Sequence, residues 1–165
     1  MAVQSEAMGR LGPDEFRAFM SHWPTGVTVI TSYDGRQPVG CTVNAMMSVS
    51  LVPPLLVVGL SEGSRTLAAV RASGLFGLNV LSAEQEDLCR QFAHGSAEER
   101  FSGLEYDQRF RTPVLSAVVA STVCQIQQAI TCGDHVLVVG EPVWQTLDEN
   151  VSPLVFHQRE YHELS

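Results

Sequence analysis

One stretch of the sequence, residues 38–66, combines residue types that suit a phosphorylated aromatic ligand. Thr42 and Asn44 alternate along a predicted strand, so both side chains are expected on one face. Gly40 and Ala45 beside them are small, so a flat ring can approach the backbone while the side-chain amide bonds its polar edge. An ordinary half-exposed polar strand face explains the same residues equally well.

A second feature of this stretch is Ser64, Arg65 and Thr66, which stand where a helix is predicted to begin. Free backbone N–H groups at a helix N-terminus, two hydroxyls and one guanidinium make a natural phosphate site. Ser64 is also an ordinary N-cap. Arg65 is unusual in a first turn, because a cation there opposes the helix dipole, and a bound anion would remove the conflict. Arg100, in an acidic segment, is either a second phosphate partner or a surface ion pair worth little.

His135 is the candidate for chemistry near a ring, because it follows a Gly-Asp turn and opens a predicted strand. It either lines a site or simply ends a hairpin. His157 and His162 share no metal-ligand spacing with it, so no metal site is expected. The sequence contains no G-x-G-x-x-G, no P-loop and no G-x-S-x-G, which leaves a Rossmann fold and a hydrolase elbow unsupported.

Composition bounds the class of protein. The 165 residues suit one domain, and 45% hydrophobic with 17% charged residues permits a sizeable core. Such low charge fits either a dense core or a surface buried against another subunit. The net charge is −8 and every basic residue is Arg, so nucleic acid and anionic membranes are poor partners.

Targeting and redox signals point to the cytoplasm. No apolar run reaches the ~18 to 20 residues of a membrane span, and no signal peptide is recognised. The four cysteines form no C-x-x-C pair, so free thiols in a reducing cytosol are expected, with a Cys124–Cys132 hairpin disulfide as the minor alternative.

The elements that must position these residues follow from periodicity. Residues 1–12 are expected to form a flexible tail and residues 13–165 a single domain. Phe16, Phe19, Met20 and Trp23 recur at helical spacing after Pro13, which predicts a helix whose aromatic face belongs to the core. Further helices are predicted from Ser64 and Ser82, and a long loop over 102–113. Strands are predicted over 27–33, 39–44, 45–51, 55–60, 75–81, 135–147 and 153–161, with residues 114–128 forming one long or two short strands.

Strands in this prediction outnumber helices and do not alternate regularly with them. That pattern favours a mostly β domain, an antiparallel barrel with short helices around it, over a doubly wound parallel sheet.

Several motifs in order along the chain carry a family resemblance. They are Pro24-Thr-Gly-Val-Thr-Val-Ile-Thr31, Gly40-Cys-Thr-Val-Asn44, Ser48-Val-Ser50 with Pro53-Pro54, Gly63-Ser-Arg-Thr66, Phe76-Gly-Leu-Asn-Val80, Gly133-Asp-His135 with Gly140-Glu141, and Pro153-Leu-Val-Phe156. Together they span about residues 13–164. The chain resembles the flavin reductase-like, FMN-binding split-barrel family, the short-chain NAD(P)H:flavin oxidoreductases of two-component flavin monooxygenases.

The resemblance implies a homodimer of six-stranded antiparallel Greek-key split barrels that uses FMN or FAD, with NADH or NADPH as co-substrate. Flavin would lie near the subunit interface. The motif match assigns roles to residues as follows: Thr42, Val43 and Asn44 at the isoalloxazine and ribityl chain with Ser48 beside them; Ser64, Arg65, Thr66, Arg100 and Phe101 at the phosphate; His135 near the ring where nicotinamide arrives; and Arg159 and Tyr161 on the nicotinamide side.

The implied reaction passes a hydride from nicotinamide C4 to flavin N5, after which reduced flavin diffuses to a partner monooxygenase. Alternatives on the same barrel are an oxidase of the pyridoxamine-phosphate type and a non-catalytic flavin-binding protein. Ala45, where the family often has a hydroxyl residue, and the Met46-Met47 pair depart from the pattern. These departures bear on flavin affinity and on the choice between FMN and FAD.

Overall fold

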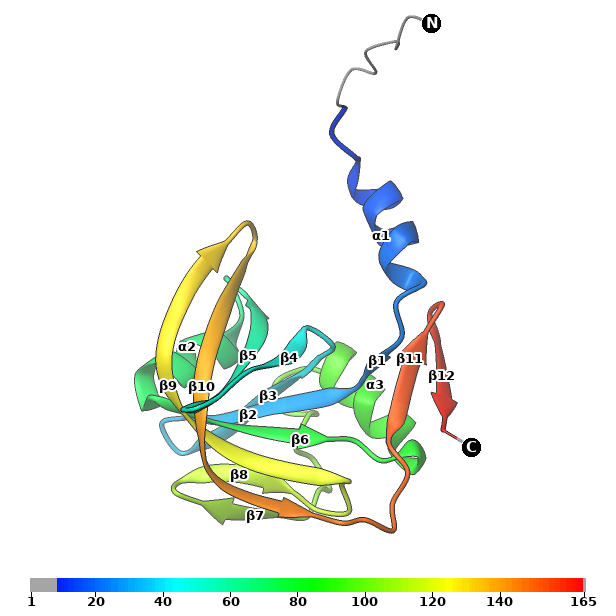
Figure 1. Cartoon of the computed structure of the whole chain (residues 1–165). Helices are drawn as coiled ribbons and strands as arrows, with labels where there is room; N and C mark the ends of the chain where they lie inside the picture. Colours follow the sequence, from blue (N-terminus) through cyan, green and yellow to red (C-terminus); the bar gives the residue numbers. More distant parts are fainter. Residues whose placement is uncertain (1–8, 165) are drawn as a thin grey trace, which may run out of the picture.

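The computed structural model describes residues 9–164 and is mostly β with three short α-helices, as the sequence pattern predicts (Figure 1). The predicted tail over residues 1–12 lies largely outside the described residues. The helices are α1 Pro13–Ser21, α2 Arg65–Ser73 and α3 Glu86–His94, with a 3₁₀ turn Ala83–Gln85 before α3. No helix within residues 9–164 is long and apolar enough to cross a membrane.

Within residues 9–164, twelve strands form three antiparallel sheets. The strands are β1 Thr25–Gly26, β2 Thr28–Asp34, β3 Gln37–Val43, β4 Met46–Leu51, β5 Pro54–Ser61, β6 Leu75–Val80, β7 Tyr106–Arg109, β8 Thr112–Leu115, β9 Ala120–Cys132, β10 His135–Leu147, β11 Leu154–His157 and β12 Glu160–Glu163. The main sheet has seven strands in the order β3-β2-β6-β9-β10-β5-β4, and the others are β1-β11-β12 and the β7–β8 hairpin.

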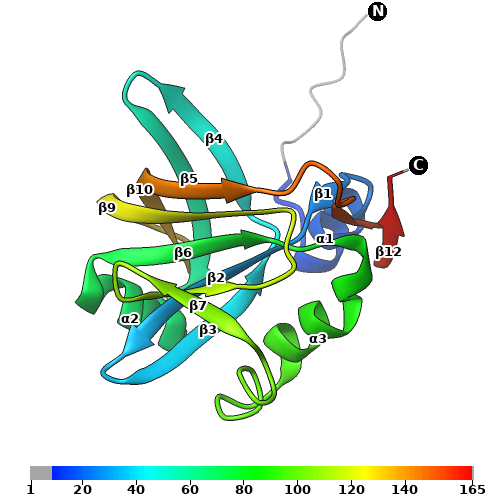
Figure 2. The same cartoon turned by 90° about the horizontal axis from the view of Figure 1, so that it is seen from below.

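The main sheet curls back on itself. Its two outermost strands, β3 and β4, are joined only by Asn44 and Ala45, so the opposite edges of the sheet meet at this link. The Gly59 N–H of β5 donates to the Ala45 carbonyl at 2.8 Å, which fastens the link to the sheet. The long β9–β10 hairpin shifts register beside Pro142, as expected for a residue that cannot donate to the ladder. The β4–β5 hairpin projects beyond the rest of the sheet (Figure 2).

The core has two parts because β2 is buried on both faces. Ile30 belongs to a cluster inside the curled sheet that includes Leu67 and Val70 of α2. Val29, on the opposite face of β2, packs in a second cluster with Phe92 of α3. The helices α2 and α3 therefore cover the sheet from different sides (Figure 1). This packing determines the positions of the helix ends.

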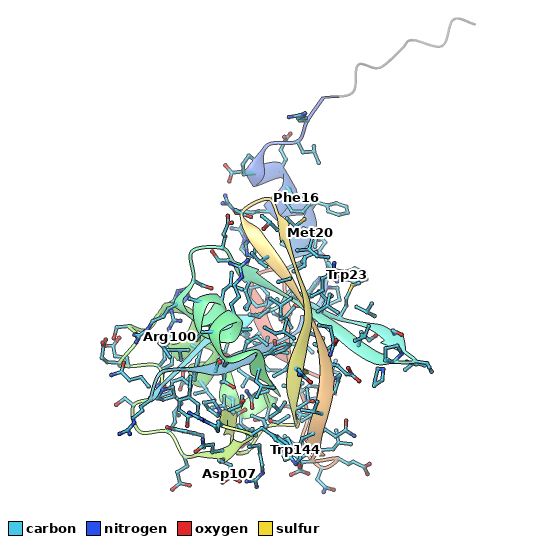
Figure 3. All side chains as sticks on the ribbon, turned by 90° about the vertical axis from the view of Figure 1, so that its left-hand side faces the viewer. Phe16, Met20, Trp23, Arg100, Asp107 and Trp144 are labelled. Atoms are coloured by element: carbon cyan, nitrogen blue, oxygen red, sulfur yellow. The ribbon has the colours of Figure 1, made fainter. Side chains whose placement is uncertain are left out.

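The prediction that the aromatic face of α1 belongs to the core is wrong. Phe16, Phe19 and Trp23 are exposed, Trp23 by 66%, and α1 stands away from the sheet. Figure 3 shows Phe16 and Met20 along this helix and Trp23 just beyond its end. Helical spacing identifies residues that share a face, but it does not say what covers that face.

The prediction of an irregular loop over residues 102–113 is also wrong in its second half. Strands β7 and β8 pair there with Arg109 opposite Thr112, so Phe110 and Arg111 form a two-residue turn. Both have positive φ, 48° and 58°, as a type I′ turn requires. The sequence signal for such turns is Asn-Gly, which is absent here. The predicted last strand likewise divides into β11 and β12. Gln158 and Arg159 form a two-residue turn between them and also have positive φ, 50° and 68°.

Asn79 on β6 connects four strands through one fully buried amide. Its Nδ2 donates to the Val29 carbonyl of β2 at 3.0 Å. Its Oδ1 accepts from the Leu115 N–H of β8 and the Ser121 hydroxyl of β9, both at 2.9 Å. A buried side chain with these partners holds the β7–β8 hairpin against the main sheet.

We expect Asn79→Ala to lower the free energy of unfolding by about 3 kcal/mol or more, because buried partners lose their hydrogen bonds. Urea denaturation measures the change. Ser121→Ala, which removes one of these bonds, should cost only about 1 kcal/mol. A loss below about 1 kcal/mol for Asn79→Ala would contradict the assigned role.

Candidate functional site

The candidate site is a cavity of about 750 Å³ between α1, the β3–β4 link, β5, β10 and the β11–β12 turn. That volume lies within the ~300 to 1,000 Å³ range of ligand sites. The lining is largely apolar with a few polar groups, and comprises Arg17, Met20, Ser21, Trp23, Thr25, Asn44, Ala45, Met46, Met47, Val57, Gly59, Leu137, Phe156 and Arg159.

One wall of the cavity is flat because its residues are small. A Cβ added at Gly59 would lie 3.1 Å from the Ala45 Cβ, closer than side chains normally pack. Gly59 therefore allows the Ala45 link to lie directly on β5. Val57 and Leu137 continue this wall. The arrangement suits the face of a planar ring, which the sequence predicts for Ala45 and Asn44.

Thr25 supplies an unsatisfied polar group to the same cavity. Its Oγ1 is buried and has no hydrogen-bond partner within residues 9–164. Strand β1 positions it, because Thr25 pairs with Phe156 of β11. A buried hydroxyl without a partner is costly, so this atom points to a ligand that bonds it.

His135 lies on the strand face that opens toward the cavity. Val136 and Val138 are fully buried in the core, so the alternating residues His135 and Leu137 face the other way, and Leu137 lines the cavity. His135 is thus about 7 Å further along β10 than Leu137. Its Nδ1 lies 2.8 Å from Asp134 Oδ1, and this hydrogen bond lowers the pKa of the Asp134 carboxyl. An ionised Asp134 orients the ring.

The predicted phosphate residues meet at the start of α2. Ser64 caps the helix by accepting from the Leu67 N–H at 3.2 Å, as the N-cap interpretation predicts. The N–H groups of Arg65 and Thr66 precede that of Ala68, which is the first to donate within the helix, and they have no intrahelical acceptor. This corner adjoins the β9–β10 turn, because Glu62 N–H donates to the Asp134 carbonyl at 3.1 Å.

The unfavourable position of the Arg65 charge at the start of α2 is offset by partners within the chain. Arg65 donates to Asp34 Oδ2 at 2.8 Å and to Gln37 Oε1 at 3.1 Å, both from the β2–β3 hairpin. Both side chains of the ion pair are about half exposed, so the pair is weak and an anionic ligand can compete with Asp34 for the guanidinium.

Arg100 and Thr66 come together around Cys41. Burial raises the pKa of the Cys41 thiol, while a hydrogen bond from Thr66 and the charge of Arg100 partly offset the increase. The Arg100 guanidinium donates to the Gly40 carbonyl at 2.7 Å and the Gly95 carbonyl at 2.9 Å. Figure 3 places Arg100 away from the α1 residues Phe16 and Trp23. Arg100 therefore borders the predicted phosphate corner rather than the apolar cavity.

Four other predicted residues are not part of the cavity lining. Val43 is buried in the core, and Ser48 is exposed on β4. Phe101 packs edge-on against Phe92 with ring centroids 5.0 Å apart. Tyr161 lies under α3, where its hydroxyl accepts from the Cys89 thiol at 3.2 Å. Burial and this contact raise the pKa of Tyr161 to about 12.

Thr42 and Asn44 do not present a shared face. The Thr42 hydroxyl donates to the Cys89 carbonyl of α3 at 2.7 Å, whereas Asn44 lies past the end of β3 and lines the cavity. The strand alternation fails because β3 ends at Val43. Of the predicted set, Asn44 and Arg159 line the cavity and His135 lies along it.

Sequence reasoning missed Thr25 and the α1 side of the cavity, Arg17, Met20 and Trp23. The helical spacing of Phe16, Phe19, Met20 and Trp23 is the signal for this side of the cavity, although spacing alone does not distinguish a cavity wall from a core face. Within residues 9–164 no three His, Cys, Asp or Glu side chains gather as a metal site. The four cysteines are free thiols.

Comparison with known sequences gives consistent matches. A family described as "Flavin reductase like domain" matches residues 20–165. A probable flavin reductase of Rhizobium meliloti is 41% identical over 129 residues, which cover 77% of this chain but only 40% of that protein. The reductase subunit HsaB of a flavin-dependent monooxygenase from Rhodococcus jostii is 32% identical over 162 residues, covering 97% of this chain and 80% of HsaB.

Solved structures agree with the sequence matches. The NADH:FAD oxidoreductase SgcE6 of Streptomyces globisporus, in complex with NAD and FAD fragments, superposes with a TM-score of 0.87 at 28% identity. The match covers 96% of this chain and 98% of that chain.

We expect Thr25→Val to leave the free energy of unfolding unchanged within about 1 kcal/mol, because the hydroxyl has no protein partner to lose. The same variant should weaken FMN binding about fivefold to tenfold, the effect of one hydrogen bond. Urea denaturation and quenching of FMN fluorescence measure the two quantities. Equal FMN affinity in both proteins would show that Thr25 does not contact the ligand.

Proposed function

The chain belongs to the flavin reductase-like domain family, and from this premise we propose that it oxidises NADH, reduces a flavin and supplies the reduced flavin to a separate monooxygenase. It is an oxidoreductase, and its nucleotide cofactors are FMN or FAD with NADH. The observation that carries the proposal is the flat apolar cavity with the orphaned Thr25 hydroxyl in its wall. A flavin has a flat ring with a polar edge. The ring face complements the apolar wall, and the polar edge can bond the Thr25 hydroxyl.

The described residues fit a bound flavin in two regions. The wall formed by Ala45 and Gly59 suits the ring face, while Asn44 and Thr25 suit its polar edge. The α2 N-terminus with Arg65 suits the phosphate. Val43, Ser48, Phe101 and Tyr161 remain predicted contacts that rest on the resemblance.

A bound flavin supplies the ring that accepts a hydride from nicotinamide. The protein contributes position and exclusion of water. Met20, Met46 and Leu137 present apolar surface that keeps water from the reacting rings. The imidazole of His135, oriented by Asp134, faces the open end through which a nicotinamide enters. Arg159, at the opposite rim, offers a guanidinium to the pyrophosphate of that nucleotide.

A loosely held flavin agrees with these contacts. The ion pair of Arg65 with Asp34 must open before the guanidinium binds a phosphate, which limits the affinity gained. A relative, HsaB, is the reductase subunit of a flavin-dependent monooxygenase. We infer that reduced flavin leaves this chain for such an oxygenase.

We also infer that the chain is a homodimer. The projecting β4–β5 hairpin carries Val49, Leu51 and Val52 exposed, Leu51 by 89%, and Phe19 of α1 and Trp23 just after it are exposed. Several large apolar side chains exposed on two projecting elements favour an interaction surface. Both elements stand away from the body of the chain (Figures 1 and 2), so a second copy can cover them and close the cavity.

Within this assembly we infer the six-stranded Greek-key split barrel of the family, with residues 13–165 as one domain in the cytoplasm. The meeting of β3 and β4 at the Asn44–Ala45 link supports that closure. Residues of α1 line the cavity together with residues of the strands, so we infer that α1 and the sheet belong to one domain.

We expect NADH oxidation to require added FMN or FAD. The loss of nicotinamide absorbance measures the reaction. A nicotinamide-dependent flavin reductase transfers the hydride only when a ring is bound to accept it. Arg65→Ala should raise the flavin KM about tenfold, the effect of one charge-assisted hydrogen bond, with little change in kcat. Arg109→Ala, which removes an exposed pair with Asp107 away from the flavin cavity, is the matched control.

No turnover with NADH or NADPH, despite FMN binding, would overturn the reductase. The result would then favour an oxidase or a non-catalytic flavin-binding protein on the same fold.

We expect sedimentation velocity to give twice the chain mass for the wild-type protein and to detect monomer for Trp23→Glu. Burying an introduced carboxylate in an apolar contact should weaken association at least about tenfold. Leu147→Glu changes an equally exposed apolar residue outside the two proposed interface elements and serves as the control. A wild-type monomer at all concentrations would contradict the homodimer.

A further inference from the structure

A second cavity, of about 570 Å³, shares no lining residue with the first. It lies where the C-terminal end of α2 meets two hairpin turns. Its lining consists of Tyr33, Gly35, Arg36, Ala72, Ser73, Leu75, Gln108, Phe110 and Arg111. None of these residues contributes to the flavin site or the phosphate corner described above.

Two turns far apart in the sequence bring one arginine each to this cavity. Asp34 pairs with Gln37 across the β2–β3 turn, which places Arg36 in its two-residue loop. Arg111 occupies the corresponding loop of the β7–β8 hairpin. Both turns lie at the α2 end of the molecule (Figure 1), and residues of both line the cavity. The fold thus assembles two guanidinium groups on one opening.

The positive charge on this opening is not neutralised by nearby carboxylates. Asp34, next to the first turn, is paired with Arg65 at 2.8 Å. Asp107, near the second, is paired with Arg109 at 3.0 Å. Within residues 9–164 neither Arg36 nor Arg111 takes part in an ion pair. Uncompensated arginines around a concave surface attract an anion.

Backbone strain at the second turn also favours a site. Phe110 and Arg111 both adopt the left-handed conformation, which is unfavourable for residues with a side chain. Asn-Gly would form the same turn without this cost. The chain shows the same arrangement once more, at Gln158 and Arg159, and Arg159 lines the first cavity. In both places a strained turn aims an arginine at an opening.

The remaining lining suits a flat ring. Phe110 is exposed and presents an aromatic face at the rim, and Leu75 adds apolar surface. Burial and then the neighbouring Tyr106 raise the pKa of Tyr33, so its hydroxyl stays protonated and can donate a hydrogen bond. An aromatic face beside two guanidinium groups is selective for a ring that carries an acidic group.

We propose that the cavity between the β2–β3 and β7–β8 turns binds a small planar aromatic anion, whose carboxylate or phosphate contacts Arg36 and Arg111 while its ring stacks on Phe110. The site is separate from flavin reduction and does not depend on the proposed function.

Isothermal titration calorimetry of the whole protein tests the proposal with four probes: benzoate, AMP, inorganic phosphate and cyclohexanecarboxylate. We expect benzoate, AMP or both to bind one per chain, and more tightly than phosphate or the non-planar carboxylate. Benzoate alone would identify a carboxylate ligand, and AMP alone a phosphorylated one. Arg36→Ala and Arg111→Ala should each weaken binding about tenfold, whereas Arg10→Ala, an exposed arginine outside both cavities, should not.

Several outcomes would overturn the site. Binding of no probe, equal binding of phosphate and AMP, or AMP binding that Arg36→Ala leaves unchanged would each do so; the last places AMP where NADH binds. Flavin-dependent NADH oxidation by the Arg36 and Arg111 variants should match wild type. Failure of the anion site and failure of the reductase are therefore observed separately.

The double variant Phe110→Asn/Arg111→Gly separates binding from folding. Because it supplies the residues that the turn favours, it should raise the midpoint of thermal unfolding while weakening the binding of benzoate or AMP at least tenfold. A variant that folds better and binds worse cannot have lost its ligand through unfolding. Unchanged affinity in this variant would overturn the assignment of Phe110 and Arg111.

Discussion

The amide of Asn79 is the constraint that fixes the β7–β8 hairpin against the main sheet, and the arrangement of the second cavity depends on it. It joins β2, β8 and β9 to β6 in the interior, where no water can replace a lost partner. Gly77, two residues earlier on β6, permits the close approach that this needs, because a Cβ there would lie 2.7 Å from the Pro113 carbonyl. The Thr31 hydroxyl donates to that same carbonyl at 2.6 Å. The β7–β8 hairpin is thus held against β2, and its turn must reach the β2–β3 turn.

The first cavity likewise depends on small residues that allow two backbone segments to lie close together. The sheet can bring β3 and β4 together only if the link between them lies close to β5, and Gly59 opposite Ala45 allows it. The same link carries Asn44, and the same strand β5 pairs with the part of β10 that carries Leu137 and His135. One close backbone contact therefore sets the ring-binding wall, its polar edge and the position of the imidazole together. A larger residue at Gly59 would disturb all three.

Sequence reasoning reached the elements whose pattern is local and missed contacts that depend on a partner. The strands, the capping of α2 by Ser64 and the register break at Pro142 follow from residue type and spacing. The acceptor of Arg65 does not, because Asp34 lies 31 residues earlier and reaches it only through the β2–β3 hairpin. The Phe110–Arg111 turn escaped notice because its residues oppose the preference of the turn they form. Sites that break a local rule are the ones that sequence patterns describe least well.

Charge distribution unites the two cavities. The chain carries a net charge of −8, yet its proposed ligands, flavin phosphates, NADH and a planar anion, are all negative. Long-range repulsion must therefore be overcome locally, within roughly the 8 Å over which charges act at physiological salt. Four arginines are already bound to carboxylates, namely Arg17, Arg65, Arg90 and Arg109. The cavity-lining residues Arg36, Arg111 and Arg159 have no such pair within residues 9–164, and each lies in a two-residue turn that fixes its backbone. Rigid turns place these charges at low entropic cost, so an acidic protein can still select anions at chosen openings.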